Sequence, residues 1–345
     1  VSMSTDDIPH PVPIWPLNPE AFRRGLAQHH DRDFVDRIVN TCYTGVDIGY
    51  HGPRFYHESP NWPSAQKYAT HVLADIDKDI AAGIKIGPFL QPPFPDSFRG
   101  SPLGAFPKKR SSKFRIIHDL SWPPGASIND FISKEEFHVK YLSLDEVISN
   151  IKQFGPHTEL AKLDLASAFQ HIPVRREDHP LLGSTVTRYD PASGSYIKEY
   201  YYDTVLQFGG RSSPKLFSDF ASAARYIMLY NGASYSEHYL DDFITMGKAG
   251  SEECKQNLDI MTRTCADLGF SLNPDKVCQP STVMEYLGIV LDTNLMQARI
   301  SEERLQDILK EMHQWEHKTS ATKREVLSLV GKLQFVSRVV RPGRT

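Results

Sequence analysis

Residues 238–245 read His238-Tyr239-Leu240-Asp241-Asp242-Phe243-Ile244-Thr245. Two adjacent carboxylates, Asp241 and Asp242, lie inside a run of residues that favour β-strands. Acids in an apolar strand are costly to remove from water, so this pair predicts a function. A tight turn at the pair would let both side chains approach one cation. An ordinary polar hairpin turn is the alternative.

A third acid, Asp164, ends a predicted apolar strand that begins at Glu159. Two divalent ions held roughly 3.5–4 Å apart need carboxylates from more than one strand. Asp164 and Asp241 can meet only if their strands are neighbours in one sheet, and we expect this arrangement. A helix cap is the alternative role for Asp164.

Five cations lie within eight positions of a segment that predicts two strands joined by a polar turn: Lys108, Lys109, Arg110, Lys113 and Arg115. A hairpin with cations on both arms is a natural clamp for a triphosphate, because arginine offers a planar fork and lysine a point charge. A solvated hairpin tip is the alternative.

The order of the central elements predicts an α+β fold with helices on one face of a sheet. Between the acid-bearing strands, 200–206 is rich in β-formers. One predicted helix begins at a capping box, Ser143 to Glu146, and ends at Gly155. A second begins at Ser213-Pro214 and ends near Tyr230, and a third begins at Ser251 and ends at Gly269. A strand pair is predicted over 284–291.

Helices are also predicted at both ends of the chain. The N-terminal ones span 18–28, 31–42 and a longer stretch from a Ser64 cap to Gly83, and 87–95 is too rich in proline for regular structure and predicts a boundary. The C-terminal ones begin at Ser301 and at Thr322. Residues 301–345 contain more Lys and Arg than Asp and Glu, which is a modest indication that this segment contacts a nucleic-acid phosphate backbone. Ordinary solvated helix faces explain the excess nearly as well.

Composition narrows the class of protein. The chain has 345 residues, 40% hydrophobic and 23% charged, which is typical of a soluble protein with several lobes. No apolar run approaches the ~20 residues of a membrane span. Four well-separated cysteines predict reduced thiols in an intracellular, non-secreted protein. The net charge of −3 argues against a generic basic nucleic-acid binder.

Ordered motifs follow one another along the chain: Ser101-Pro102-Leu103-Gly104, Lys108-Lys109, Arg115-Ile116-Ile117-His118-Asp119-Leu120-Ser121, Ser127-Ile128-Asn129-Asp130, Lys162-Leu163-Asp164, Leu206-Gln207-Phe208-Gly209, Tyr239-Leu240-Asp241-Asp242, Tyr286-Leu287-Gly288 and Arg341-Pro342-Gly343-Arg344. With them, the chain resembles reverse transcriptases, specifically those of DIRS-like retrotransposons, from about Pro11 onward. The resemblance implies a right-hand polymerase fold. Its parts would be an N-terminal extension (1–87), fingers (88–140 and 172–212), palm with an antiparallel sheet (141–171 and 213–294) and helical thumb with the start of the connection (295–345).

The resemblance also implies an RNA-directed DNA polymerase that adds dNTPs to a primer 3′-hydroxyl on an RNA or DNA template. Asp164 and Asp241 would be the principal ligands of two Mg²⁺ ions, with Mn²⁺ as an alternative, and Asp242 would support them. RNase H and recombinase domains would follow this chain in the parent element. An RNA-dependent RNA polymerase and a non-catalytic nucleic-acid-binding relic are the alternatives.

Other site residues come from the same resemblance. The implied nucleotide-binding residues are Lys108, Arg115, Phe169, Phe208 and Lys276, with Phe169 excluding a ribose 2′-hydroxyl. The implied primer grip is Met284, Glu285, Tyr286, Leu287 and Gly288. The family usually has proline at Gln207 and a larger residue at Gly210, so we expect a looser loop beside the nucleotide.

Overall fold

The computed structural model describes residues 16–108 and 112–340. The chain divides into two compact units, one formed by residues 1–140, 165–227 and 264–271 and the other by 141–164, 228–263 and 272–345. Helices and mostly antiparallel sheets occur in both units, which confirms the α+β class.

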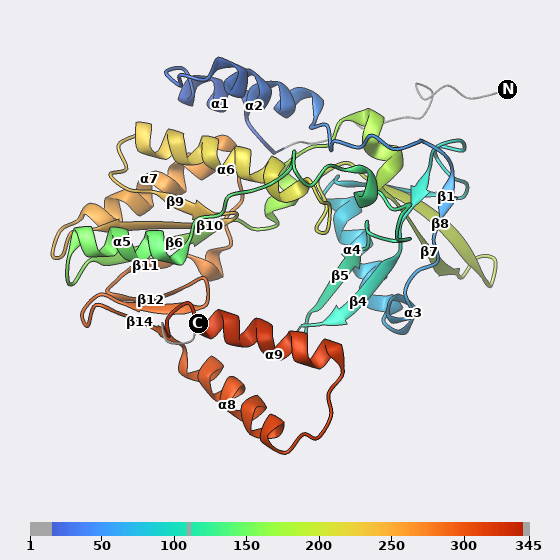
Figure 1. Cartoon of the computed structure of the whole chain (residues 1–345). Coiled ribbons are helices and arrows are strands. Elements are labelled where there is room, and N and C mark those ends of the chain that lie inside the picture. The colour runs from blue at the N-terminus through green and yellow to red at the C-terminus, as the bar shows by residue number, and fades with distance from the viewer. Residues whose placement is uncertain (1–15, 109–111, 341–345) are drawn as a thin grey trace. The chain divides into compact units, whose positions relative to one another are not determined.

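A four-stranded sheet in the second unit carries the acidic residues (Figure 1). Its order is β11 (Cys278–Ser281), β6 (Glu159–Asp164), β10 (Asp242–Gly247) and β9 (Glu237–Tyr239), and every neighbouring pair is antiparallel. The strands that end at Asp164 and begin at Asp242 are therefore neighbours, as predicted.

Helix α5 (Leu144–Phe154) packs against this sheet. The predicted capping box and the Gly155 stop are both present. The α5 core includes Ile244 and Met246 of β10, whereas Phe243 and Thr245 alternate to the opposite face and are equally buried. We expected helices to cover one face of the sheet, but the structure buries both.

The strand pair predicted over 284–291 is present as β12 (Val283–Tyr286) and β13 (Ile289–Asp292), and β14 (Gln297–Ile300) extends it to three strands. Leu287 and Gly288 form the two-residue turn, with φ of 50° and 78°. Both values lie in the left-handed region that this kind of hairpin turn requires.

Two long helices match their sequence signals closely. Helix α6 (Ser213–Tyr230) begins and ends as predicted. Helix α7 (Glu253–Leu268) is followed by Gly269 at φ 89°, but it begins two residues after Ser251. The Ser251 hydroxyl still accepts a hydrogen bond from the Glu253 amide at 3.3 Å.

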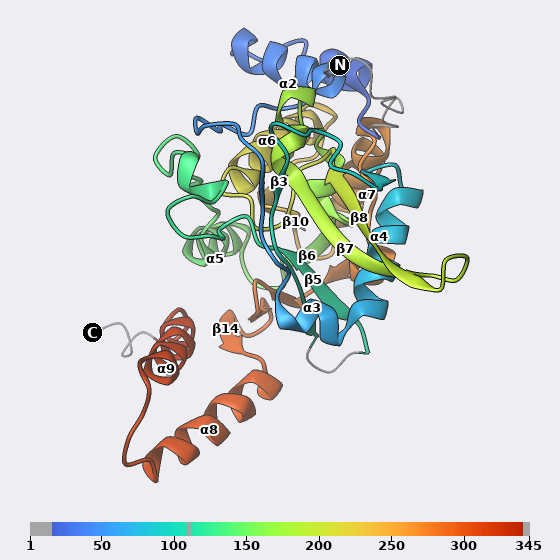
Figure 2. The ribbon, with the colours of Figure 1, turned by 90° about the vertical axis from the view of Figure 1, so that its right-hand side faces the viewer.

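The first unit contains a five-stranded sheet in the order β1 (His57–Glu58), β3 (Arg99–Gly100), β7 (Gly183–Asp190), β8 (Ser195–Asp203) and β2 (Lys85–Phe89). Figure 2 shows β7 and β8 side by side as a long hairpin. The prediction that 87–95 lacks regular structure is wrong at its start, because β2 continues to Phe89. Pro88 is tolerated since β2 is an edge strand whose register shifts between Ile86 and Phe89.

The basic segment forms two paired strands, β4 (Leu103–Pro107) and β5 (Phe114–His118), as predicted. The Lys108 amide donates to the Lys113 carbonyl at 2.9 Å beyond the last strand pair. The predicted cations Lys109 and Arg110 lie outside the described residues, as does the motif at 341–344.

The N-terminal helices are α1 (Pro19–Gly25), α2 (Arg32–Thr44), α3 (Pro63–Lys67) and α4 (Ala69–Ala81). The single helix expected from Ser64 to Gly83 is broken at Tyr68, whose φ of −116° and ψ of 38° are not helical. The Ser64 hydroxyl accepts from the Ala105 amide at 3.2 Å instead of capping a helix. Tertiary contacts therefore outweigh the helical pattern here.

The C-terminal helices are α8 (Glu302–Glu316) and α9 (Lys323–Val336), and Thr322 forms the predicted capping box with Glu325. Ser301 occupies the N-cap position of α8, but its side chain makes no capping hydrogen bond. Within residues 16–108 and 112–340, no helix combines the length and apolar character needed to cross a membrane.

Candidate active site

The acidic pair lies at the tip of the β9–β10 hairpin. Tyr239 pairs with Asp242, so Leu240 and Asp241 form the turn. Leu240 adopts a φ of 52°, and its carbonyl lies 3.2 Å from Nδ1 of His238. The tight turn predicted for this stretch is present.

Asp164 lies directly opposite Asp242 in the register of β6 and β10. Its backbone carbonyl accepts a hydrogen bond from the Asn273 amide at 2.9 Å, and the residue is only 5% exposed. Three acids from two neighbouring strands thus meet at one end of the sheet. The sequence predicted this juxtaposition.

Crowding and burial change the proton affinity of the acids. Burial, the hydrogen bond to Asp164 and the charges of Asp241 and Asp164 raise the pKa of Asp242 to about 6. Burial, with the nearby Asp164 charge, also raises the pKa of Asp241. A bound cation would relieve this repulsion.

Lys276 already supplies one positive charge. Its Nζ donates to both Asp164 carboxylate oxygens, at 3.0 Å and 3.2 Å. Burial alone would lower the pKa of Lys276, but its hydrogen bond to Asp164 and the charges of the three acids outweigh burial and raise it. The lysine that the resemblance assigned to nucleotide binding therefore contacts a predicted metal ligand.

The donor chemistry of the acids fits a divalent ion, since Mg²⁺ prefers carboxylate oxygens. In the part of the chain that the structure describes, only His313, Glu316 and His317 place three ligand atoms all within 4.8 Å of one another. The three aspartates are therefore not closed into a tight ligand set, and Lys276 shares Asp164 with any ion that binds there.

The predicted primer-grip hairpin is attached to the acid-bearing strands. The Tyr286 hydroxyl donates to the Asp242 carbonyl at 3.1 Å, and Lys162 Nζ donates to the Glu285 carbonyl at 2.9 Å. The Met284 and Tyr286 side chains are buried, so Glu285 and the Leu287–Gly288 turn remain for contact with a ligand. Sequence reasoning quoted Lys162 in a motif but gave it no role.

The two predicted aromatic residues of the nucleotide site contact each other in the first unit. The rings of Phe169 and Phe208 are 4.7 Å apart, and Phe169 also packs edge-on against Phe217 at 5.5 Å. Phe169 is 7% exposed and Phe208 is 58% exposed. Phe208 therefore presents an exposed ring surface, and the buried ring of Phe169 packs against it.

Asn129 is a site residue that sequence reasoning missed. Its side-chain NH₂ donates to the Gly209 carbonyl at 2.8 Å, and its Oδ1 accepts from the Arg211 amide at 2.8 Å. Both bonds fasten the loop of Gln207 and Gly210 that we expected to be loose. The motif 127–130 contains Asn129, but only the folded chain shows which loop it reaches.

The two predicted triphosphate contacts lie on the basic hairpin. Arg115 is exposed on β5, opposite Phe106 of β4, and Lys108 is exposed just beyond β4. The structure thus leaves both cations accessible to an anion.

Comparison with known proteins gives the family. A family model described as reverse transcriptase (RNA-dependent DNA polymerase) matches residues 107–291, which is more than half of the chain. The chain belongs to the reverse transcriptase family. The matched residues include all three acids, Phe169, Phe208 and the predicted primer-grip residues 284–288.

Solved structures support the same fold. A foamy viral protease-reverse transcriptase dRH in complex with ds DNA matches with a TM-score of 0.59 and 16% identity, covering 99% of this chain and 58% of that chain. A foamy viral protease-reverse transcriptase in complex with dsDNA matches with a TM-score of 0.58 and 16% identity, covering 95% and 65%. The same viral protein in complex with an RNA/DNA hybrid gives 0.57 and 16%, covering 95% and 42%.

These similarities give the chain the right-hand polymerase fold of reverse transcriptases. The chain spans less than two thirds of the length of these viral proteins. Among curated proteins, none matches the chain.

Proposed function

We propose that this reverse transcriptase chain is an active RNA-directed DNA polymerase that adds dNTPs to a primer 3′-hydroxyl on an RNA or DNA template. The pairing of Asp164 with Asp242, with Asp241 in the adjoining turn, is the observation that carries the proposal. Acids gathered in this way would repel a phosphate backbone unless a metal neutralised them. Their presence in a member of this family therefore favours catalysis over passive binding.

The proposed cofactor is a pair of Mg²⁺ ions, with Mn²⁺ as the alternative. Asp164 and Asp241 would hold them and Asp242 would support them, in keeping with the raised pKa values of Asp241 and Asp242. When bound, such ions activate the primer hydroxyl and neutralise charge on the leaving pyrophosphate. The protein's part is to position the reactants and stabilise charge.

The proposed nucleotide contacts divide by chemistry. Lys108, Arg115 and Lys276 would bind phosphates, which carry no base information. Phe208 would line the nucleotide pocket, and Phe169 would exclude a 2′-hydroxyl. The accessible cations and the free face of Phe208 support these roles.

The remaining proposals concern context. We propose fingers, palm and thumb with the boundaries given above, and an origin in a DIRS-like retrotransposon whose parent protein carries RNase H and recombinase domains. The four free cysteines support an intracellular site of action.

Primer extension tests the function. A primed RNA template is incubated with dNTPs, then with NTPs, each with and without Mg²⁺. The proposal expects Mg²⁺-dependent extension with dNTPs. Extension with NTPs alone would indicate an RNA polymerase, and template binding without extension would indicate a relic.

A further inference from the structure

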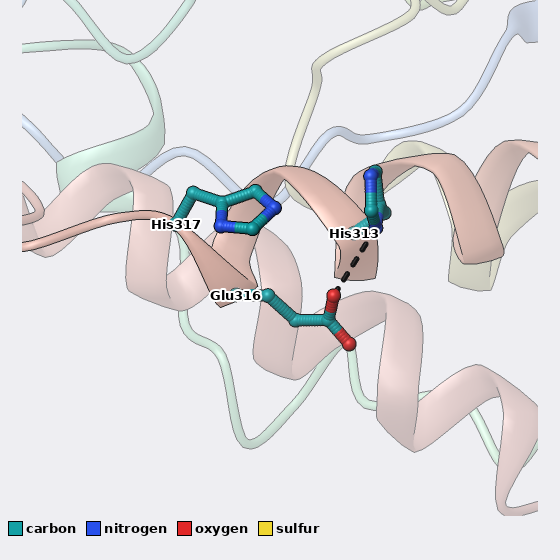
Figure 3. A group of neighbouring side chains, drawn as sticks. All are labelled: His313, Glu316 and His317. Atoms are coloured by element: carbon teal, nitrogen blue, oxygen red, sulfur yellow. Dashed lines mark hydrogen bonds and ion pairs between the residues drawn. The ribbon is translucent and has the colours of Figure 1, made fainter.

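A cluster of three potential metal ligands lies at the C-terminal end of α8, and none of the three is a residue proposed for polymerisation. His313, Glu316 and His317 are spaced i, i+3 and i+4, which places them on one side of a helix. One ligand atom from each lies within 4.8 Å of the other two. Figure 3 shows the three side chains gathered at the end of the helix.

The three side chains of this cluster are close together and open to solvent. Nδ1 of His313 lies 3.1 Å from Oε2 of Glu316, and the two imidazole rings have centroids 5.2 Å apart at 85°. All three residues are exposed, so an ion can enter from solvent without opening the protein. The alternative explanation is that His313 and Glu316 form only a surface ion pair. Such an exposed pair would contribute little stability.

The position in the helix favours a cation. Helix α8 ends at Glu316, and His317 is its C-cap, so the negative end of the helix dipole and the last carbonyls lie beside the cluster. The next residue, Lys318, would oppose a metal, but its Nζ pairs with Glu325 at 2.6 Å and lies 5.1 Å from the centre of the Trp315 ring. Its positive charge is therefore offset by Glu325.

We propose that His313, Glu316 and His317 form a binding site for a transition-metal ion of the Zn²⁺ class. Two imidazoles and one carboxylate are a known zinc donor set that leaves a fourth position for water. Imidazole nitrogen selects such ions over Mg²⁺, which prefers oxygen ligands. The bound ion connects the last turn of α8 to its C-cap and so stabilises that end of the helix.

Calorimetric titration of the chelator-treated full chain with Zn²⁺ alone tests the site. The Cys278→Ser background removes a half-buried thiol that could also bind zinc. We expect a Zn²⁺ binding event that is lost or weakened more than ~10-fold in His313→Ala and in His317→Ala, since even loss of an outer partner costs about 10–100-fold. Glu316→Gln should weaken it less. His138→Ala, another exposed histidine, should behave as the parent does.

Hydrogen exchange gives a second readout that does not depend on activity. Zn²⁺ should slow exchange of the amides near residues 313–317 in the parent and in His138→Ala, but not in His313→Ala. Equal zinc affinity in the parent and both histidine variants, or unchanged protection of the α8 end, would overturn the proposal and leave only the surface ion pair.

Discussion

Asp242 is paired in register with Asp164 across strands β10 and β6. A slip of one residue would turn one of these acids to the opposite face of the sheet. The neighbouring pair, Phe243 with Leu163, is fully buried and resists such a slip, because one of these side chains would have to move to the opposite face, which other buried side chains such as Ile244 already fill. The buried core of this sheet therefore sets the geometry of the acids.

The first prediction concerns Asn129. Replacing it with alanine removes both side-chain bonds to the loop of Gln207 and Gly210, so the Gly209 carbonyl and the Arg211 amide lose these hydrogen bonds. We expect the KM for every dNTP to rise by about tenfold, with a smaller effect on kcat, in steady-state primer extension.

Asn61 offers a matched control for this prediction. Its side chain also connects two backbone groups, donating to the Thr185 carbonyl at 2.7 Å and accepting from the Leu103 amide at 2.8 Å. Asn61→Ala should cost similar stability but leave KM unchanged. A similar KM increase in both variants would show that Asn129 acts only through stability.

Phe169 is predicted to discriminate between sugars. Phe169→Val should raise the ratio of ribonucleotide to deoxynucleotide kcat/KM by one or more orders of magnitude, because a flat ring excludes a hydroxyl. Phe217→Leu controls for a disturbed aromatic cluster, since Phe217 contacts Phe169 and is fully buried. An unchanged ratio in Phe169→Val, measured on folded protein, would remove this residue from the nucleotide site.

Arg115 is predicted to bind the triphosphate. Arg115→Ala should raise the KM for all four dNTPs alike, by about tenfold or more, because a charged hydrogen bond contributes ~1.5–3 kcal/mol. Lys134→Ala removes another exposed cation and should have no effect. An effect confined to one base would contradict a phosphate contact.

We predict that the protonation of Asp79 on α4 makes the free energy of unfolding depend on pH. Burial raises its pKa from the ordinary value of 3.8 to about 6. The folded state therefore holds this proton more tightly than the unfolded state does, so the unfolding free energy falls as pH rises from about 4 to about 6. The loss is at most about 3 kcal/mol above that window.

Asp79→Asn removes the titratable group and therefore its contribution to the pH dependence of the unfolding free energy. Urea unfolding should show the variant gaining stability over the parent at pH 7.5 and little or none at pH 4. Asp36→Asn, which removes an exposed carboxylate, should show no such difference. A constant difference between Asp79→Asn and the parent at both pH values would contradict the assignment.

Local signals predicted much of the secondary structure and the meeting of the acids. The capping box at Ser143, the Ser213-Pro214 start of α6 and the positive-φ glycines that follow α6 and α7 act within a few residues, so they depend little on distant partners. The meeting of Asp164 with the acidic pair was predictable because Asp164 ends one β-forming run and the pair lies inside another, whereas the pairing of Asp164 with Asp242 is seen only in the structure.

Other features that depend on distant partners were missed or predicted wrongly. The break at Tyr68 accompanies packing of its ring against Phe114 at 4.6 Å, and Pro88 is accepted only because β2 is an edge strand. The hydrogen bond from the Asn129 side chain to the Gly209 carbonyl joins residues that are 80 positions apart in the sequence. No local pattern encodes such contacts, so they emerge only from the folded chain.

The central claim is that Asp241 acts in metal-dependent nucleotide addition. The most direct measurement is single-nucleotide incorporation by Asp241→Asn with saturating dNTP and Mg²⁺ on a primed RNA template, together with template-primer affinity. We predict that incorporation is abolished while affinity and folding stay near the parent values, and that Asp242→Asn is milder. Incorporation by Asp241→Asn at the parent rate would contradict the account.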